Sequence, residues 1–91
     1  MENENIKPFA DIGARLKWHR EQVEQLNQAE YAATIGAKRA RYSHWENGSF
    51  RLSLDGALAL RKRYGLSLDF LYEGIDDALP MTLRKAWRDK P

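Results

Sequence analysis

Four side chains that can bind a polyanion are closely spaced between residues 38 and 44. Lys38, Arg39 and Arg41 supply three cations within four residues, and His44 follows three residues later. Guanidinium and ammonium groups donate hydrogen bonds to phosphate oxygens and to the acceptor atoms on a guanine edge. A solvated helical face is the alternative interpretation of a charge run. The chemistry that these residues favour is nucleic-acid binding.

The positive charge is concentrated in the middle of the chain. Residues 38–63 carry a net charge of +5, whereas the whole 91-residue chain carries only +2. Such a block is typical of a surface that attracts a polyanion. A second cation run, Arg61, Lys62 and Arg63, lies near a predicted helix C-terminus, where cations are favoured anyway. We therefore do not expect this second run to contact nucleic acid.

Several kinds of chemistry lack the residues that they need. The chain has no cysteine, which removes disulfides, cysteine-based zinc sites and a thiol nucleophile. It has no phosphate-binding loop and no HExxH motif, and the paired carboxylates Asp76 and Asp77 fall in a predicted linker. His19 has no acidic or cysteine partner at a metal-like spacing and is predicted at the surface. The sequence predicts no enzyme, no metal and no cofactor.

The N-terminal segment and the apolar runs indicate where the protein works. MENENIKP is acidic and polar, unlike a signal peptide. No apolar run approaches the roughly 20 residues of a membrane span. We expect no membrane contact and a cytoplasmic, nucleoid-associated location, or the nucleus in a eukaryote.

The periodicity of apolar residues predicts an all-α chain that positions the basic residues. Asn27, Ser53 and Ser67 are predicted N-caps, and Gly36 a left-handed helix end. Helices are expected over 9–24, 28–35, 38–46, 54–64 and 68–73, with a short extra helix over 81–90. The predicted inward side chains are Phe9, Ile12, Leu16, Val23, Leu26, Tyr31, Ala32, Ile35, Tyr42, Trp45, Leu54, Ala57, Leu58, Tyr64, Leu68, Leu71 and Tyr72.

The segment 28–46 has the spacing of a helix-turn-helix. Small Ala32 allows close approach of two helices, and Gly36 makes the turn without strain at Cβ. Tyr42 and Trp45 are predicted to face the core rather than to stack on bases. That arrangement leaves the basic residues of the second helix on its outer face, which suits the major groove.

Here the sequence resembles the Cro and phage-repressor class, the XRE-like or lambda-repressor-like helix-turn-helix family. The resemblance covers about residues 9–74. It rests on Asn27-Gln28, Glu30, Ala32, Gly36, SHWENG at 43–48 and GLSLDFLYEG at 65–74. It implies a compact five-helix DNA-binding domain.

The resemblance also implies roles for individual residues. Base contacts would come from Lys38, Arg39, Ala40, Arg41 and His44, with Arg41 open between a base and a phosphate. Phosphate contacts are expected from Gln28, Asn27, Ser43, Asn47 and Arg51. The structural positions are Arg20, Ala32, Gly36, Tyr42, Trp45 and Glu46, with Arg20 pairing with Glu46 in a salt bridge rather than Glu46 acting as a catalytic acid.

The chain departs from the family pattern in two places. No glycine precedes Asn27, so the first turn is open to a different geometry. Tyr42 and Trp45 are bulkier than the usual aliphatic residues, which leaves room for a shifted angle of helix 38–46.

Three segments and three functional hypotheses follow. We expect a flexible N-terminus at 1–8, the helix-turn-helix domain at 9–74 and a tail at 75–91. Trp18, Leu83 and Trp87 indicate a second apolar contact, made either by the tail folding back or by a partner chain.

The first hypothesis is a sequence-specific transcriptional regulator of the prophage-repressor type, binding a palindromic operator as a homodimer through helix 68–73 or the tail. The alternatives are an antitoxin whose tail holds a toxin, and a protein-interaction adaptor that does not bind DNA.

Overall fold

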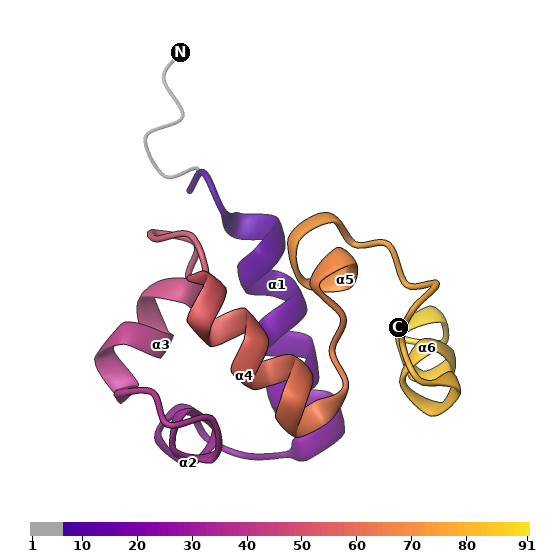
Figure 1. Cartoon of the computed structure of the whole chain (residues 1–91), viewed down its shortest axis with the longest axis horizontal. Helices are drawn as coiled ribbons and strands as arrows, with labels where there is room; N and C mark the ends of the chain where they lie inside the picture. The colour runs from indigo at the N-terminus through magenta and orange to yellow at the C-terminus, as the bar shows by residue number, and fades with distance from the viewer. Residues whose placement is uncertain (1–6) are drawn as a thin grey trace.

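The protein is described by a computed structural model that covers residues 7–91, and Figure 1 shows its helical chain. No strand occurs between residues 7 and 91, so the all-α prediction is confirmed for the described chain. The predicted N-terminal segment 1–8 falls mostly on residues 1–6, which lie outside the described residues. The helices are α1 (Ala10–Trp18), a π-helix η1 (His19–Glu24), α2 (Gln28–Thr34), α3 (Arg39–Glu46), α4 (Leu54–Tyr64), α5 (Leu68–Glu73) and α6 (Met81–Arg88).

The N-termini of α2, α4 and α5 are capped by the predicted residues. The backbone N–H of Glu30 donates to the Asn27 side chain at 2.8 Å, and the Glu30 carboxylate accepts from the Asn27 N–H at 3.0 Å. Ser53 caps α4 and Ser67 caps α5, each accepting a backbone N–H three residues later. These caps satisfy N–H groups that have no partner within the helix, so they define where each helix begins.

The first helix differs from the single helix predicted over 9–24. Regular α-helix ends at Trp18, and the chain continues as the π-helix η1. Gln25 then adopts a left-handed conformation with φ 57°, the only positive φ among the described non-glycine residues. With no glycine before Asn27, the chain makes this bend with a wider helical turn and a glutamine in the left-handed conformation.

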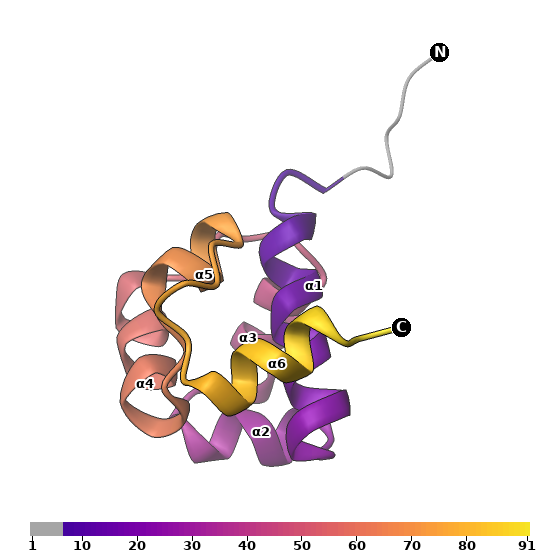
Figure 2. The ribbon, with the colours of Figure 1, turned by 90° about the vertical axis from the view of Figure 1, so that its right-hand side faces the viewer.

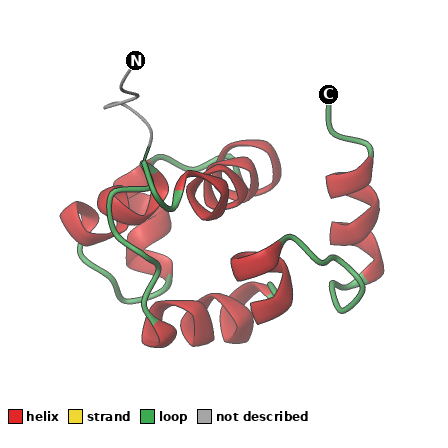
Figure 3. Ribbon diagram, turned by 90° about the horizontal axis from the view of Figure 1, so that it is seen from above, coloured by secondary structure: helices red, strands yellow, loops and turns green. Residues whose placement is uncertain are grey.

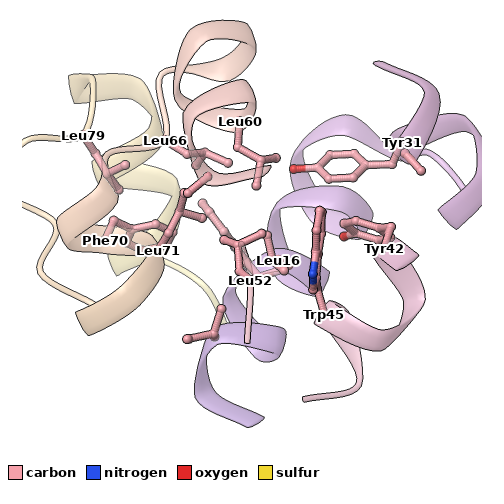
Figure 4. Packing of buried hydrophobic residues seen from close by; sticks show 14 residues of the cluster. Leu16, Tyr31, Tyr42, Trp45, Leu52, Leu60, Leu66, Phe70, Leu71 and Leu79 are labelled. Atoms are coloured by element: carbon pink, nitrogen blue, oxygen red, sulfur yellow. The ribbon is translucent and has the colours of Figure 1, made fainter. Parts of the chain in front are cut away.

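The buried apolar core is formed by side chains from α1, α2, α3, α4 and α5 and from the loops that follow α3, α4 and α5, and Figure 4 shows their packing. Two predictions for α4 are wrong, because Leu54 is 59% exposed and Leu58 is 36% exposed. The buried side of α4 is formed instead by Gly56, Ala57 and Leu60. A side chain larger than hydrogen at position 56 would collide with the Trp45 ring, so the bulky indole determines which side of α4 faces inward.

Gly13 sets the distance between α1 and α3. A Cβ atom built on this buried glycine would overlap the backbone carbonyl of Glu46. The two helices therefore approach each other backbone to backbone. The apolar periodicity of the sequence gives no sign of Gly13, although this glycine determines how closely α3 packs on α1.

The C-terminal tail folds back on its own chain. Figure 2 shows α6 lying across the domain, and Figure 3 shows it at one edge. The Trp87 ring lies edge-on to Trp18 at 5.0 Å and to Phe70 at 4.9 Å. Leu79 is buried, and Arg88 forms a two-bonded ion pair with Asp76 at 2.8 and 3.0 Å. Of the two predicted uses of Trp18 and Trp87, the structure has the intramolecular one.

None of the helices between residues 7 and 91 is long and apolar enough to cross a membrane.

Candidate nucleic-acid interface

The outer side of α3 carries the basic residues singled out from the sequence. The side chains of Lys38, Arg39, Arg41 and His44 are exposed, as is Ala40 between them. Figure 1 shows α3 at the edge of the molecule, with the other helices on one side of it only. None of these cations forms an ion pair with another residue between 7 and 91. This face therefore presents uncompensated positive charge to the solvent.

The basic residues of α3 are held to different degrees. Arg39 is the first residue of the helix and Lys38 is its N-cap, without a side-chain capping bond. The Arg41 guanidinium lies over the Trp45 ring at 5.0 Å, and the His44 ring lies 4.7 Å from Phe50. Aromatic contacts restrain the two residues nearer the C-terminus, whereas Lys38 and Arg39 project from the N-terminal end.

The inner side of α3 is organised around the Glu46 carboxylate. Arg20 donates to it through Nε and Nη2, both at 2.8 Å, which is the ion pair expected from the sequence. The Tyr42 hydroxyl donates at 2.7 Å and the Gln28 amide at 3.0 Å. One carboxylate thus ties η1, α2 and α3 together, and this fixes α3 relative to the start of α2.

These contacts determine the charge of the cluster. Burial opposes ionisation of Glu46, but hydrogen bonds from Arg20, Tyr42 and Gln28 outweigh it and hold the Glu46 pKa below its usual value. The hydrogen bond to Glu46 raises the pKa of Arg20. Burial, followed by the hydrogen bond to Glu46, raises the pKa of Tyr42. The cluster is consequently an ion pair with a neutral tyrosine at physiological pH.

Gln28 stands between the buried cluster and the solvent. Its amide nitrogen donates one hydrogen to Glu46. An amide nitrogen carries two hydrogens, so a second donor remains for an external acceptor. Glu46 thereby restrains a half-buried side chain at the first position of α2.

The other predicted phosphate ligands lie at the N-cap of α2, on α3 and in the loop after α3. The Asn27 oxygen is used by the cap of α2, and the Asn47 oxygen accepts the Ser49 backbone N–H at 2.9 Å. Their NH₂ groups are the donors that could meet an anion. Arg51 is exposed with its guanidinium 5.5 Å from the Phe9 ring centroid, and Ser43 is half-buried on α3. The structure therefore spreads these residues over α2, α3 and the loop after α3.

His19 is buried, so its predicted surface position is wrong. It is 1% exposed, and its Nδ1 shares a hydrogen bond of 2.6 Å with the Tyr31 hydroxyl. The Tyr64 ring lies 4.7 Å away, and Tyr64 stacks on Tyr31. Burial lowers the pKa of His19 to about 4, so the ring is neutral at physiological pH. His19 joins η1 to α2 and α4 and is a structural residue.

The comparisons with known proteins agree with this geometry. A family model described as helix-turn-helix matches residues 16–71, more than half of the chain. That range contains the Glu46 cluster with its partners Arg20, Gln28 and Tyr42. It also contains the whole of α2 and of α3 with its basic residues. No curated protein and no solved structure matches the chain. The protein belongs to the XRE-like, lambda-repressor-like helix-turn-helix family of DNA-binding transcription regulators.

Proposed function

We propose that the protein is a sequence-specific repressor of the prophage type, which places α3 in the major groove of its operator. The observation that carries the proposal is the division of α3 into two sides. The inner side is bound to Arg20 and Gln28 through Glu46, whereas the outer side presents cations that no described residue compensates. Such a rigid, exposed basic helix suits base-edge readout.

The base contacts are assigned to the outer side of α3. Arg39 projects from the first helical position and can donate two hydrogen bonds to a guanine edge. Lys38 can reach the same acceptors with less directional restraint. The methyl group of Ala40 can pack on a thymine methyl group. Arg41 and His44 lie further along the helix, where their aromatic neighbours restrict their reach.

The phosphate contacts are assigned to the rim around α3. Gln28 would use its second amide hydrogen while Glu46 keeps the side chain in place. Asn27, Ser43, Asn47 and Arg51 would contact the backbone on either side of the groove. Contacts of this kind set the register of the protein on the duplex but carry no sequence information directly.

Binding to a palindromic operator as a homodimer completes the proposal. One eight-residue helix reads only a few base pairs. Two copies related by a twofold axis would read half-sites about 34 Å apart, one turn of the duplex.

Selection from a random duplex pool, at two salt concentrations, tests the proposal. Enrichment of an inverted repeat with half-sites about one turn apart is the expected outcome. Binding that falls with salt and enriches no sequence would reduce the protein to a phosphate-binding domain and refute the repressor assignment.

Substitution of one base-reading residue gives a sharper test. Arg39→Ala should lose roughly 1–3 kcal/mol of discrimination between the selected operator and an altered one, while salt-dependent non-specific binding persists. Arg63→Ala, an exposed cation on α4, is the matched control and should retain the discrimination. Fluorescence anisotropy with both duplexes measures the difference. Unchanged discrimination in Arg39→Ala would contradict the assignment of α3 to base readout.

The two other hypotheses find less support in the contacts. An antitoxin would use its tail to hold a toxin, yet the Trp87 side of the tail already packs on Trp18 and Phe70. An adaptor without DNA binding would tolerate charge reversal on the outer side of α3. Lys38→Glu combined with Arg41→Glu should instead abolish duplex binding without unfolding the domain, because both side chains are exposed.

A further inference from the structure

A groove lies between the C-terminal ends of α2 and α4. Its volume is about 390 Å³. Thr34 and Ile35 form the wall at the end of α2, and Ala59, Lys62 and Arg63 form the wall on α4. A space of this size is comparable with sites that take a small ligand or a few side chains of a peptide. The groove shares no residue with the outer side of α3 or with the Glu46 cluster, so the proposed DNA contacts do not use it.

Hydrogen bonds at the groove hold its two walls together. The Thr34 hydroxyl donates to the Tyr31 carbonyl at 2.6 Å and shares a second hydrogen bond of 2.6 Å with the Tyr64 hydroxyl. The Tyr64 ring stacks on the Tyr31 ring, with the centroids 5.4 Å apart. The ends of α2 and α4 are thereby tied to each other, so the groove is a fixed part of the folded domain.

The cations on the α4 wall have no anionic partner in the domain. Lys62 and Arg63 are exposed, and neither forms an ion pair among residues 7–91. The Arg63 guanidinium lies over the Tyr64 ring, 5.3 Å from its centroid. The dipole of α4 favours cations anywhere on its last turn. Two of the three cations nevertheless line this one groove, whereas Arg61 lines a separate pocket.

The rest of the groove is largely apolar. Ile35 and Ala59 line it from opposite walls, and both are half-buried. Covering such side chains with another apolar group removes them from water, which favours binding. A phosphate group alone would satisfy the cations but would leave the apolar part uncovered. The groove therefore fits an occupant that carries apolar side chains and carboxylates together.

We infer that this groove is a docking site for an acidic amphipathic helix of a partner protein. Its apolar side chains would cover Ile35 and Ala59, and its carboxylates would pair with Lys62 and Arg63. Residues 7–91 contain no strand to which an extended peptide could add, so a helix seated between two helices is the form that suits the site. The inference goes beyond DNA binding and does not depend on it.

Selection from a displayed library of amphipathic helices tests the inference with the full chain. The library fixes leucine at positions i and i+4 on one face and varies the flanking positions among glutamate, serine and lysine. The protein itself then selects the charge of its ligand. The wild type should enrich glutamate at the flanking positions. Enrichment of lysine, or no enriched sequence, would overturn the inference.

Charge reversals on α4 locate the enriched peptide. Lys62→Glu combined with Arg63→Glu should weaken its binding by at least about tenfold, because like charges then face its carboxylates. Arg61→Glu is the matched control, since it reverses an exposed cation of the same turn that lines a separate pocket. Its dissociation constant, measured by fluorescence anisotropy, should match that of the wild type. An equal loss in Arg61→Glu would reduce the effect to general charge attraction and remove the docking site.

A neutral substitution tests the groove itself. Ala59→Gln leaves the net charge unchanged and fills part of the groove with a longer side chain that helices accept well. Peptide binding should fall, while circular dichroism should show an intact helical fold. Binding as tight as in the wild type would place the peptide elsewhere and contradict the inference.

Duplex binding by single variants separates a peptide site from a nucleic-acid contact. Lys62→Glu and Arg63→Glu should each lower duplex affinity no more than Arg61→Glu does, because each reverses one charge on the same turn. A larger loss confined to Lys62 and Arg63, with peptide binding indifferent to both, would assign these cations to phosphates and overturn the inference. Failure to select an operator would remove the proposed repressor but leave the peptide result unchanged.

Discussion

The two sides of α3 differ in how completely the fold uses their side chains. On the inner side, Glu46 receives four hydrogen bonds, from Arg20, Tyr42 and Gln28, at 2.7–3.0 Å. On the outer side, Lys38 and Arg39 have no ion-pair partner among residues 7–91. Both sides belong to one helix of eight residues. Stability and binding are therefore assigned to different side chains on opposite sides of the same short helix.

This difference means that the two properties should be separable by substitution. Removing a partner from the buried side leaves a charge without compensation in the protein interior. Removing a cation from the exposed side changes a surface that is already in contact with water. The free energy of unfolding should therefore change little. The four changes that follow test the separation, from the largest expected effect on stability to the smallest.

Glu46→Gln should cause the largest loss. Arg20 would keep its guanidinium in a largely buried position with only the exposed Glu21 carboxylate, 3.3 Å away, as a counter-ion, at a cost of about 3–5 kcal/mol in the free energy of unfolding. Urea denaturation followed by circular dichroism measures it. Glu21→Gln is the control, because Glu21 contacts the same guanidinium at 3.3 Å from an exposed position. Equal losses in the free energy of unfolding would show that the buried Glu46 contributes no more to stability than the exposed Glu21.

His19, buried between η1, α2 and α4, should make the stability of the domain sensitive to acid. Its pKa is about 4 in the folded protein against 6.5 when unfolded, so between these values the unfolded chain binds more protons. The contribution of the neutral His19 ring to the free energy of unfolding is therefore fully present above about pH 6.5. It is lost as the pH drops toward 4, by at most roughly 3 kcal/mol. Glu24, 3.8 Å from Nε2, would soften the fall by stabilising the protonated ring, while Tyr31 and Tyr64 offer no charge.

Denaturation midpoints for the wild type and His19→Gln, across this pH range, check the prediction. The variant keeps a polar side chain that does not titrate, so its stability should stay level down to the range where carboxylates protonate. The lowered pKa of Glu46 places its own loss at more acidic pH. A wild-type profile as flat as that of the variant would remove His19 as the cause.

Gly36 lies between α2 and α3, and its substitution tests the backbone conformation of the turn instead of a side-chain contact. Its φ is 70°, and a Cβ atom built there meets nothing within 4 Å. Gly36→Ala should therefore cost only the left-handed conformation, about 1 kcal/mol. Asparagine tolerates this conformation better, so Gly36→Asn should lose less. Thermal melting of the two variants gives the order, and an alanine as stable as glycine would mean that the turn relaxes.

Arg41→Ala should have the smallest effect on the free energy of unfolding. This substitution bears on both stability and DNA binding, because the Arg41 side chain is exposed and also contacts Trp45. The guanidinium is exposed but lies over the Trp45 ring, a contact worth about 0.5 kcal/mol at such a site. Duplex binding should lose about one unit of salt dependence if Arg41 meets a phosphate. Titrations at several salt concentrations measure that slope. An unchanged slope would assign Arg41 to the fold or to a base edge.

Much of the fold was predictable because local chemistry determines it. Asn27, Ser53 and Ser67 cap helices where they were expected, since each side chain satisfies N–H groups a few residues away. The pairing of Arg20 with Glu46 was expected from a family pattern rather than from spacing, because the two residues are 26 positions apart.

The errors arise where tertiary contacts override a helical period. The π-helix η1 changes which residues of the first helical segment face inward. As a result, the three consecutive residues Trp18, His19 and Arg20 are all buried. On α4, the Trp45 ring needs the hydrogen of Gly56, which turns Leu54 and Leu58 outward. Neither effect can be read from the residues of one helix alone. The assigned DNA contacts of α3 remain predictions.

The Trp18–Trp87 pair gives the molecule an intrinsic optical probe. The two indoles meet edge-on at 5.0 Å, one from α1 and one from α6, while Trp45 is buried elsewhere against Gly56. Indole emission depends on exposure, so a released tail would brighten or shift two of the three tryptophans and leave Trp45 almost unchanged. A Trp45→Phe variant would thus report the state of the tail alone, without any attached dye.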